Sequence, residues 1–247
     1  PGILWIHGGG YAIGTPEQDA LFINRFIAAS GAVVVAPDYT LSIDAPYPAA
    51  LDDCYAALLW LRDNGAKYGM RSDQIFVGGD SAGGGLTVAI SLLARDRGEV
   101  NIAFQMPLYP MLDDRPTPSN TDNDAPVWNT KSNEAGWSLY LGELYRAEDV
   151  PAYAATARCS DYRNLPPTCS YVGSVEPFYD ETVAYIHNLK EAGIETQFKI
   201  FDGCFHAFDL VCYPTKIAKQ ARAFLMECFR YAVGHYFAKQ NVDDLEA

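Results

Sequence analysis

Ser81 lies in a glycine-rich stretch, G-G-D-S-A-G-G-G-L at 78–86, which follows an apolar run at 74–77 and precedes a helical pattern at 86–95. A serine in G-x-S-x-G between a strand and a helix is typical of a nucleophile elbow, a turn that exposes the hydroxyl at the end of the strand. We expect the turn to be so tight that a side chain at Gly79 or Gly83 would collide with neighbouring backbone. Free N–H groups at the helix start then favour a developing negative charge. Because a helix that merely packs closely on a strand can carry the same letters, the stretch needs partners elsewhere in the chain.

A serine hydroxyl becomes a nucleophile when a base lies within hydrogen-bond reach and an acid orients that base. His206 follows the last expected strand, and a carboxylate cluster follows the strand before it (Glu176, Asp180 and Glu181). We place all three types of group at carboxyl ends of strands, the edge where parallel sheets carry their sites. The order serine, carboxylate, histidine is that of one class of serine hydrolases. The alternative for His206 is a loop histidine packed between phenylalanines; His187 and His235 are expected on helix surfaces or in packing.

A second glycine run, His7-Gly8-Gly9-Gly10, follows the apolar strand pattern at 3–6. Three glycines in succession leave N–H groups exposed with no side chains in the way, which suits an anion. The alternative is a flexible turn. His7 precedes Ser81 and so does not fit the order serine, carboxylate, histidine. We therefore expect its ring to fix this loop by hydrogen bonds and not to act as the base.

The elements that must position these groups alternate along the chain. Alternation of strands and helices predicts one α/β domain over 1–247, a mostly parallel sheet with helices on both faces. The valine run at 32–36 is of the kind buried on both faces. The segment at about 111–158 breaks the alternation, and we expect an insertion that lies as a lid over the carboxyl edge of the sheet; the alternative is a surface loop with its own apolar cluster. Strands are expected at 3–6, 32–36, 74–77, 102–108, 168–172 and 196–201, and helices at 19–30, 46–68, 86–95, 180–192 and 217–238.

Composition limits the possible partners. The net charge of −13 argues against nucleic acid and anionic membrane. No apolar run is long enough to span a bilayer, the first residues lack the basic region of a signal peptide, and the histidines show no metal-ligand spacing, so neither metal nor cofactor is expected. Six scattered cysteines favour a reducing, cytoplasmic location, with a Cys159–Cys169 bridge left open.

Together, these motifs resemble the hormone-sensitive-lipase-like family of α/β-hydrolases, in its bacterial carboxylesterase branch. H-G-G-G at 7–10 matches the oxyanion motif of that family and G-D-S-A-G-G at 79–84 its elbow. D-Y-T-L at 38–41, Y-P-A-A-L-D-D at 47–53 and L-P-P-T at 165–168 are similar to further family segments. The resemblance covers nearly the whole chain.

The resemblance implies a role for each matching residue. Ser81 would be the acylated nucleophile and His206 the general base and acid. The family acid stands in D-P-L-x-D-E; the matching segment here is E-P-F-Y-D-E at 176–181, so Glu176 takes that place, with Asp180 as the alternative acid unless it caps its helix. The base stands in H-A-F at 206–208, not the usual H-G-F. The oxyanion would be held by N–H groups of Gly9, Gly10 and Ala82, with Gly8 supporting the loop.

The chain starts at the strand that leads to the oxyanion loop, so the cap helices and first antiparallel strands of the family are absent from it. We expect either a fragment or a form with a reduced lid. The pocket would then be more open, and an uncovered sheet edge would favour a homodimer.

The leading hypothesis is a serine carboxylesterase for small-molecule, short-acyl esters. The first alternative is an amidase or arylformamidase, which would use the same triad to cleave a different bond. A catalytically silent ligand-binding protein, like the plant hormone receptors of the family, is the alternative from another class. Candidate pocket residues are Tyr11, Asp80, Trp128, Trp137, Phe178 and Phe208.

Overall fold

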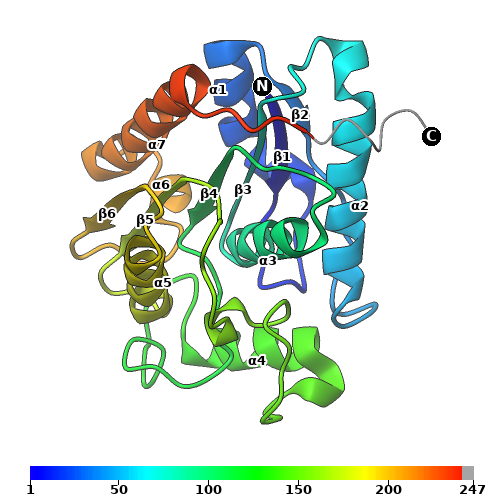
Figure 1. Ribbon diagram of the computed structural model, residues 1–247. Coiled ribbons are helices and arrows are strands. Elements are labelled where there is room, and N and C mark those ends of the chain that lie inside the picture. The colour runs from blue at the N-terminus through cyan, green and yellow to red at the C-terminus, as the bar shows by residue number, and fades with distance from the viewer. Residues whose placement is uncertain (241–247) are drawn as a thin grey trace.

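The computed structural model describes residues 1–240. Six strands form one sheet in the order β2-β1-β3-β4-β5-β6, and each neighbouring pair is parallel (Figure 1). The central strands read as continuous apolar runs because helices cover both of their faces. The strands are β1 Gly2–Ile6, β2 Val33–Val35, β3 Ile75–Asp80, β4 Phe104–Leu108, β5 Thr168–Gly173 and β6 Thr196–Phe201.

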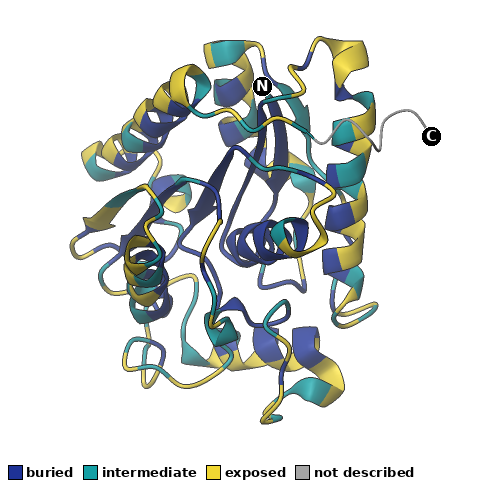
Figure 2. Cartoon of the chain, in the orientation of Figure 1, coloured by how far each residue is buried: buried dark blue, intermediate teal, exposed yellow. Residues whose placement is uncertain are grey.

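Helices pack on both faces of this sheet, and Figure 2 shows buried strands between helices whose outer sides are exposed. On one face, α1 and α7 contact each other and share an apolar cluster with the sheet. On the other face, α2 and α3 share a second cluster, and α5 joins α3 in a third. The helices are α1 Ala20–Ser30, α2 Ala49–Asn64, α3 Ala82–Arg97, α4 Thr130–Leu141, α5 Tyr179–Glu191, α6 Phe208–Val211 and α7 Lys216–His235, with short 3-10 helices Pro16–Asp19, Gly65–Tyr68, Gly142–Leu144 and Thr156–Arg158.

The expected order of strands and helices is confirmed, with one error of burial and small shifts of boundaries. The valine run forms β2, but Val33–Val35 are only half-buried because β2 is an edge strand and has one neighbour instead of two. The helix predicted over 46–68 is shorter in the structure, because α2 spans Ala49–Asn64 and a 3-10 turn, Gly65–Tyr68, completes the stretch.

The segment at 111–158 contains α4, which lies beyond the carboxyl ends of the strands (Figure 1). It packs on the side of the sheet that carries the glycine loop. The ring of Tyr140 in α4 stacks on Tyr11 at 3.8 Å, and the N–H of Tyr47 donates to the Tyr140 carbonyl at 2.7 Å. The insertion is therefore packed against the sheet edge that carries Ser81.

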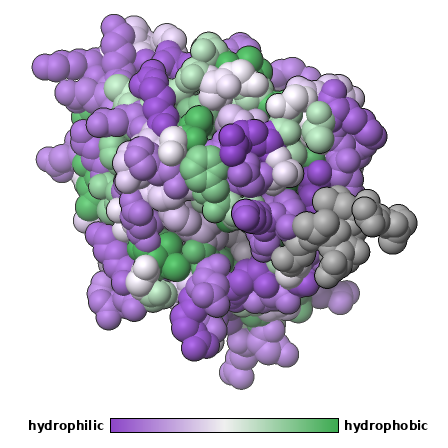
Figure 3. Space-filling view, turned by 45° about the horizontal axis from the view of Figure 1, so that its top comes forward, coloured by the Kyte–Doolittle hydropathy of each residue, from purple (hydrophilic) through white to green (hydrophobic). Residues whose placement is uncertain are grey.

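All six cysteines are free thiols, so the bridge between Cys159 and Cys169 is not formed. Over residues 1–240, no helix combines the length and the apolar character that crossing a bilayer requires. The same residues contain no cluster of three histidine, cysteine or acidic side chains arranged to hold a metal ion. Polar side chains dominate the face in Figure 3, with apolar residues in small separate groups.

Candidate active site

The turn at Ser81 has the geometry of a nucleophile elbow. Ser81 joins β3 to α3 with φ 57° and ψ −120°, a region that a non-glycine residue rarely adopts and that active sites concentrate. A Cβ at Gly79 would lie 2.4 Å from the Ile6 carbonyl oxygen, and one at Gly83 would lie 2.0 Å from the same atom. The expected collision at both glycines is thus confirmed, because β1 passes directly beside the turn.

Three side chains distant in the sequence form one line of hydrogen bonds. Nε2 of His206 lies 2.9 Å from Oγ of Ser81, and Nδ1 lies 2.5 Å from Oε2 of Glu176. An ionised carboxylate only accepts, so Nδ1–H donates to Glu176, which leaves Nε2 free to accept the serine proton. All three groups are almost fully enclosed, with 5 %, 0 % and 3 % exposure for Ser81, Glu176 and His206.

The carboxylate of Glu176 is held in place by two donors. Its second oxygen accepts the N–H of Gly173, at the end of β5, at 2.7 Å. Burial raises the pKa of Glu176 above its usual range, while His206 and the Gly173 N–H oppose that rise. The imidazole of His206 is held edge-to-face by Phe178 and Tyr109, each with its ring centroid 4.9 Å away.

The other two members of the acidic cluster do not reach the histidine. Oδ2 of Asp180 accepts the N–H of Ser119 at 2.7 Å. Oε1 of Glu181, which is buried, accepts the N–H groups of Leu112 and Asp113 at 2.6 and 3.2 Å. Asp180 as the alternative acid is therefore wrong, and so is its role as a helix cap, because its carboxylate bonds to the insertion and not to an N–H of α5. Both carboxylates instead tie the insertion to the start of α5.

The glycine loop after β1 lies beside Ser81 and is held from below. Nδ1 of His7 donates to the Gly8 carbonyl at 2.7 Å, and its ring stacks on Tyr39 at 4.2 Å, which confirms that His7 fixes the loop. Burial lowers the pKa of His7, which favours the neutral ring. Gly9 and Gly10 adopt φ 118° and 59°, so glycine suits both positions.

Asp80 lies beneath this loop and not in an open pocket. It is buried, and one of its oxygens lies 2.9 Å from the point that a Cβ on Gly8 would occupy. Its carboxyl interacts with that of Asp19, and Oδ1 of each has no hydrogen-bond donor among the described residues, whereas Oδ2 of Asp19 accepts the indole N–H of Trp5 at 2.8 Å. Burial raises the pKa of both carboxyls, and that of Asp19 reaches about 6. Two carboxyls in contact share a proton, because two buried like charges would repel each other.

Sequence reasoning missed Asp19, which looks like an ordinary acidic residue at a helix start. It also missed Asp209, a buried carboxylate that accepts the hydroxyls of Tyr109 and Tyr171 at 3.1 and 2.7 Å. Tyr109 in turn contacts the ring of His206. These partners come from separate strands and loops, so the sequence carries no local signal for them.

The aromatic candidates for the pocket form three groups. Phe178 and Trp128 lie near the imidazole, with the centroid of Trp128 6.4 Å from that of His206. Tyr11 and Trp137 are buried and contact each other, and the hydroxyl of Tyr11 donates to a main-chain carbonyl. Phe208 is buried and packs against Phe201 with ring centroids 5.3 Å apart.

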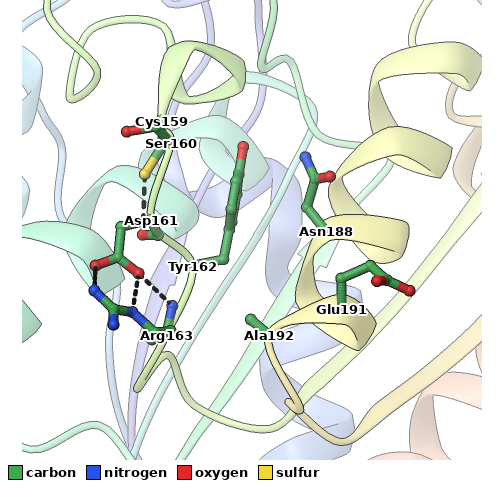
Figure 4. A pocket seen from close by; sticks show the side chains of 8 residues that line it. All are labelled: Cys159, Ser160, Asp161, Tyr162, Arg163, Asn188, Glu191 and Ala192. Atoms are coloured by element: carbon green, nitrogen blue, oxygen red, sulfur yellow. Dashed lines mark hydrogen bonds and ion pairs between the residues drawn. The ribbon is translucent and has the colours of Figure 1, made fainter.

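Other histidines and cavities stand apart from this cluster. His187 and His235 are exposed on helices, as expected. A cavity of about 420 Å³ lies between the 159–163 turn and the last turn of α5 (Figure 4). Its charged pair, Asp161 and Arg163, is bonded internally, and α5 runs from the carboxyl to the amino end of the sheet. The cavity is therefore at the opposite end from Ser81.

Residues 3–210 match the family model described as alpha/beta hydrolase fold. Esterase LipI from Mycobacterium tuberculosis is 35% identical over 199 residues, which are 80% of this chain and 62% of LipI. Carboxylesterase NlhH from the same organism is 33% identical over 203 residues, 80% of this chain and 63% of NlhH. The chain thus spans somewhat less than two thirds of the length of these relatives.

Solved structures give the same result. A bacterial heroin esterase is 38% identical with a TM-score of 0.91, covering 94% of this chain and 74% of that one. Esterase LipW from Mycobacterium marinum is 29% identical with a TM-score of 0.89, covering 94% of this chain and 73% of that one. Fold, glycine motifs and relatives agree: the chain belongs to the α/β-hydrolase fold family, in its hormone-sensitive-lipase-like branch with the bacterial carboxylesterases.

Proposed function

We propose that this chain is a serine hydrolase that cleaves short-acyl carboxylic esters through an acyl-enzyme on Ser81. The observation that carries the proposal is the hydrogen-bonded line from Glu176 through His206 to Ser81. It ends beside a glycine loop with backbone N–H groups to offer. The esterases among the relatives support an ester as the bond that is cleaved.

In the first half of the reaction, Nε2 of His206 takes the proton of Ser81 as Oγ bonds to the ester carbonyl carbon. The carbonyl oxygen becomes an alkoxide, and the N–H groups of Gly9, Gly10 and Ala82 stabilise it. Ala82 is the first residue of α3, where N–H groups have no partner within the helix. Each such donor lowers the barrier by about 3–4 kcal/mol.

The tetrahedral intermediate then breaks the bond to the leaving oxygen, which takes the proton from His206 and departs as the alcohol. In the second half, His206 removes a proton from water as the water oxygen attacks the acyl carbon. The bond to Ser81 breaks, the hydroxyl regains its proton, and the carboxylic acid leaves. Glu176 keeps the imidazole in the required tautomer throughout.

Replacing Ser81 by Ala tests this proposal. The variant should lose hydrolysis of p-nitrophenyl acetate and labelling by a fluorophosphonate probe. Ser91→Ala is the matched control, because Ser91 is another buried serine of α3 whose hydroxyl donates to the Thr87 carbonyl. Undiminished turnover by Ser81→Ala would overturn the mechanism.

The same triad could cleave an amide or formamide. Turnover of matched ester and anilide or formamide substrates in one assay decides between the bonds. A silent ligand-binding protein would lack labelling by the fluorophosphonate probe, whereas the orientation of His206 toward Ser81 supports a reactive serine.

The proposal also covers the role of the insertion, the cellular location and the oligomeric state. The insertion at 111–158 acts as a lid in one domain with the sheet, and the free cysteines support a cytoplasmic location. The edge strand β2 supports pairing of two copies, which sedimentation analysis would detect as a dimer.

A further inference from the structure

The indole ring of Trp128 lies beside both the glycine loop and His206. Its six-membered ring covers the oxyanion loop so closely that a Cβ at Gly10 would lie 2.2 Å from Cη2. Its ring centroid lies 6.4 Å from that of His206 and 6.3 Å from that of Phe178.

The backbone holds this ring in place from both sides. Val127, just before it, has φ 70°, which is a genuine outlier for a β-branched residue. The N–H of Trp128 donates to the Pro126 carbonyl at 2.9 Å, which closes a tight three-residue turn around Val127. On the other side, Asn129 caps α4 by accepting the N–H of Ser132. Strained backbone of this kind clusters at functional sites, where it positions a group.

The side chain is fixed as well. Nε1 of Trp128 donates to Oδ1 of Asn133, one turn into α4, at 3.4 Å. A Cβ at Gly136 would lie 3.2 Å from Cζ2, so glycine at that position lets α4 approach the indole. The ring is therefore clamped between α4 and the oxyanion loop.

The chemistry decides which part of an ester meets this ring. The carbonyl oxygen must lie at the N–H groups of the glycine loop, and the leaving oxygen must lie within hydrogen-bond reach of Nε2 of His206. Trp128 borders both of these points. The carbon attached to the leaving oxygen therefore begins next to the indole, whereas the acyl chain has no need to approach His206.

We propose that Trp128 is a specificity-determining residue that walls the leaving-group side of the site and restricts the alcohol part of the ester to small groups. The inference rests on the proposed esterase function and adds to it the size of the alcohol. Trp128 excludes bulky alcohols because the low exposure of Ser81 and His206 leaves little room around a clamped ring.

The test compares two substrate series with wild type, Trp128→Ala and Trp128→Phe. The first series holds acetate constant and enlarges a primary alcohol: ethyl, butyl, cyclohexylmethyl and 2-phenylethyl acetate. Primary alcohols are similar leaving groups, so size is the main variable. The second series holds ethanol constant and lengthens the acyl group from acetate to octanoate. The measured quantity is kcat/KM relative to ethyl acetate.

For Trp128→Ala, we expect the relative kcat/KM of the cyclohexylmethyl and 2-phenylethyl esters to rise about tenfold or more, with a smaller rise for Trp128→Phe. The acyl series should keep its profile. Trp60→Ala is the matched control, because Trp60 is an exposed tryptophan of α2 that contacts Tyr68 instead of the triad. Its alcohol profile should equal that of wild type.

An unchanged alcohol profile in both Trp128 variants would overturn the inference, and so would a shift confined to the acyl series. If Trp128→Ala does not fold, by circular dichroism and thermal melting, Trp128→Phe decides the outcome. Wild type that cleaves no ester in either series would remove the proposed function itself, whereas active wild type with unchanged variants removes only the role of Trp128.

Discussion

Exchange of Glu176 for Gln would remove one negative charge with little change of shape. The carboxylate accepts two hydrogen bonds, from the N–H of Gly173 at 2.7 Å and from Nδ1 of His206 at 2.5 Å. A glutamine amide has one accepting oxygen and one donating nitrogen. If the oxygen stays on His206, the amide NH2 faces the Gly173 N–H. If the amide turns over, its NH2 donates to Nδ1, and the proton moves to Nε2, which then cannot accept from Ser81.

The size of the effect follows from that choice of tautomer. Loss of the carboxylate in a serine triad lowers kcat about 10⁴-fold, which corresponds to about 5.5 kcal/mol of barrier at 1.36 kcal/mol per factor of ten. Glu176→Asp keeps the charge but shortens the stem by one methylene, so it cannot reach both donors. A displacement of this size costs about 10²-fold, so Glu176→Asp should fall between wild type and Glu176→Gln.

Steady-state hydrolysis of p-nitrophenyl acetate gives kcat, and thermal melting shows whether each variant is folded. Asp180→Asn is the matched control, since its carboxylate accepts from Ser119 and lies on the same segment. That variant should retain kcat near the wild-type value. The assignment of the acid fails if Glu176→Gln stays within about tenfold of wild type in kcat, far from the 10⁴-fold loss, or if Asp180→Asn loses as much.

Two further outcomes concern the fold around the site. Gly83→Ala should lower the free energy of unfolding by more than about 4 kcal/mol, because its Cβ would lie 2.0 Å from the Ile6 carbonyl oxygen. Gly31→Ala is the control: its φ is 66° and the space around it is open, so the loss should be about 1–2 kcal/mol. Equal losses of the two variants in urea unfolding would contradict the argument. Because burial raises the pKa of Asp19 from 3.8 to about 6, its stabilising contribution is complete below pH 3.8 and lost as pH rises through about 6. Asn at position 19 carries no titratable proton, so the free energy of unfolding of Asp19→Asn should fall less than that of wild type between pH 3.8 and about 6. Urea unfolding at a series of pH values measures this, and parallel pH curves for the two proteins would refute the shared proton.

Several features could be predicted because local constraints encode them. Glycine at 79 and 83 reports a turn with no room for a Cβ, and the structure confirms it. Apolar runs alternating with amphipathic stretches indicate a parallel sheet, whose carboxyl ends then gather Ser81 and His206 at one edge. The segment 176–181 pointed to Glu176 through its match to the family motif, and the hydrogen bond to His206 agrees.

Other features depend on the path of the chain in space. The partial burial of all three valines of β2 follows from its position at the sheet edge, which the valines themselves do not reveal. The carboxylates of Asp180 and Glu181 accept hydrogen bonds from the insertion, because the first turn of α5 lies against residues more than sixty positions earlier in the sequence. The pairing of Asp19 with Asp80 likewise joins two elements that no short-range pattern connects.

The elbow, the glycine loop, the order of the catalytic groups and the layers of the fold can thus be predicted from the sequence, since each depends on the conformational range of a few adjacent residues or on the periodicity of apolar ones. The sharing of a proton by two acids beneath the loop, and the aromatic ring that borders the reacting atoms, follow only from the three-dimensional packing. These choices depend on contacts between distant segments, and a side chain acquires such partners only when packing brings those segments together.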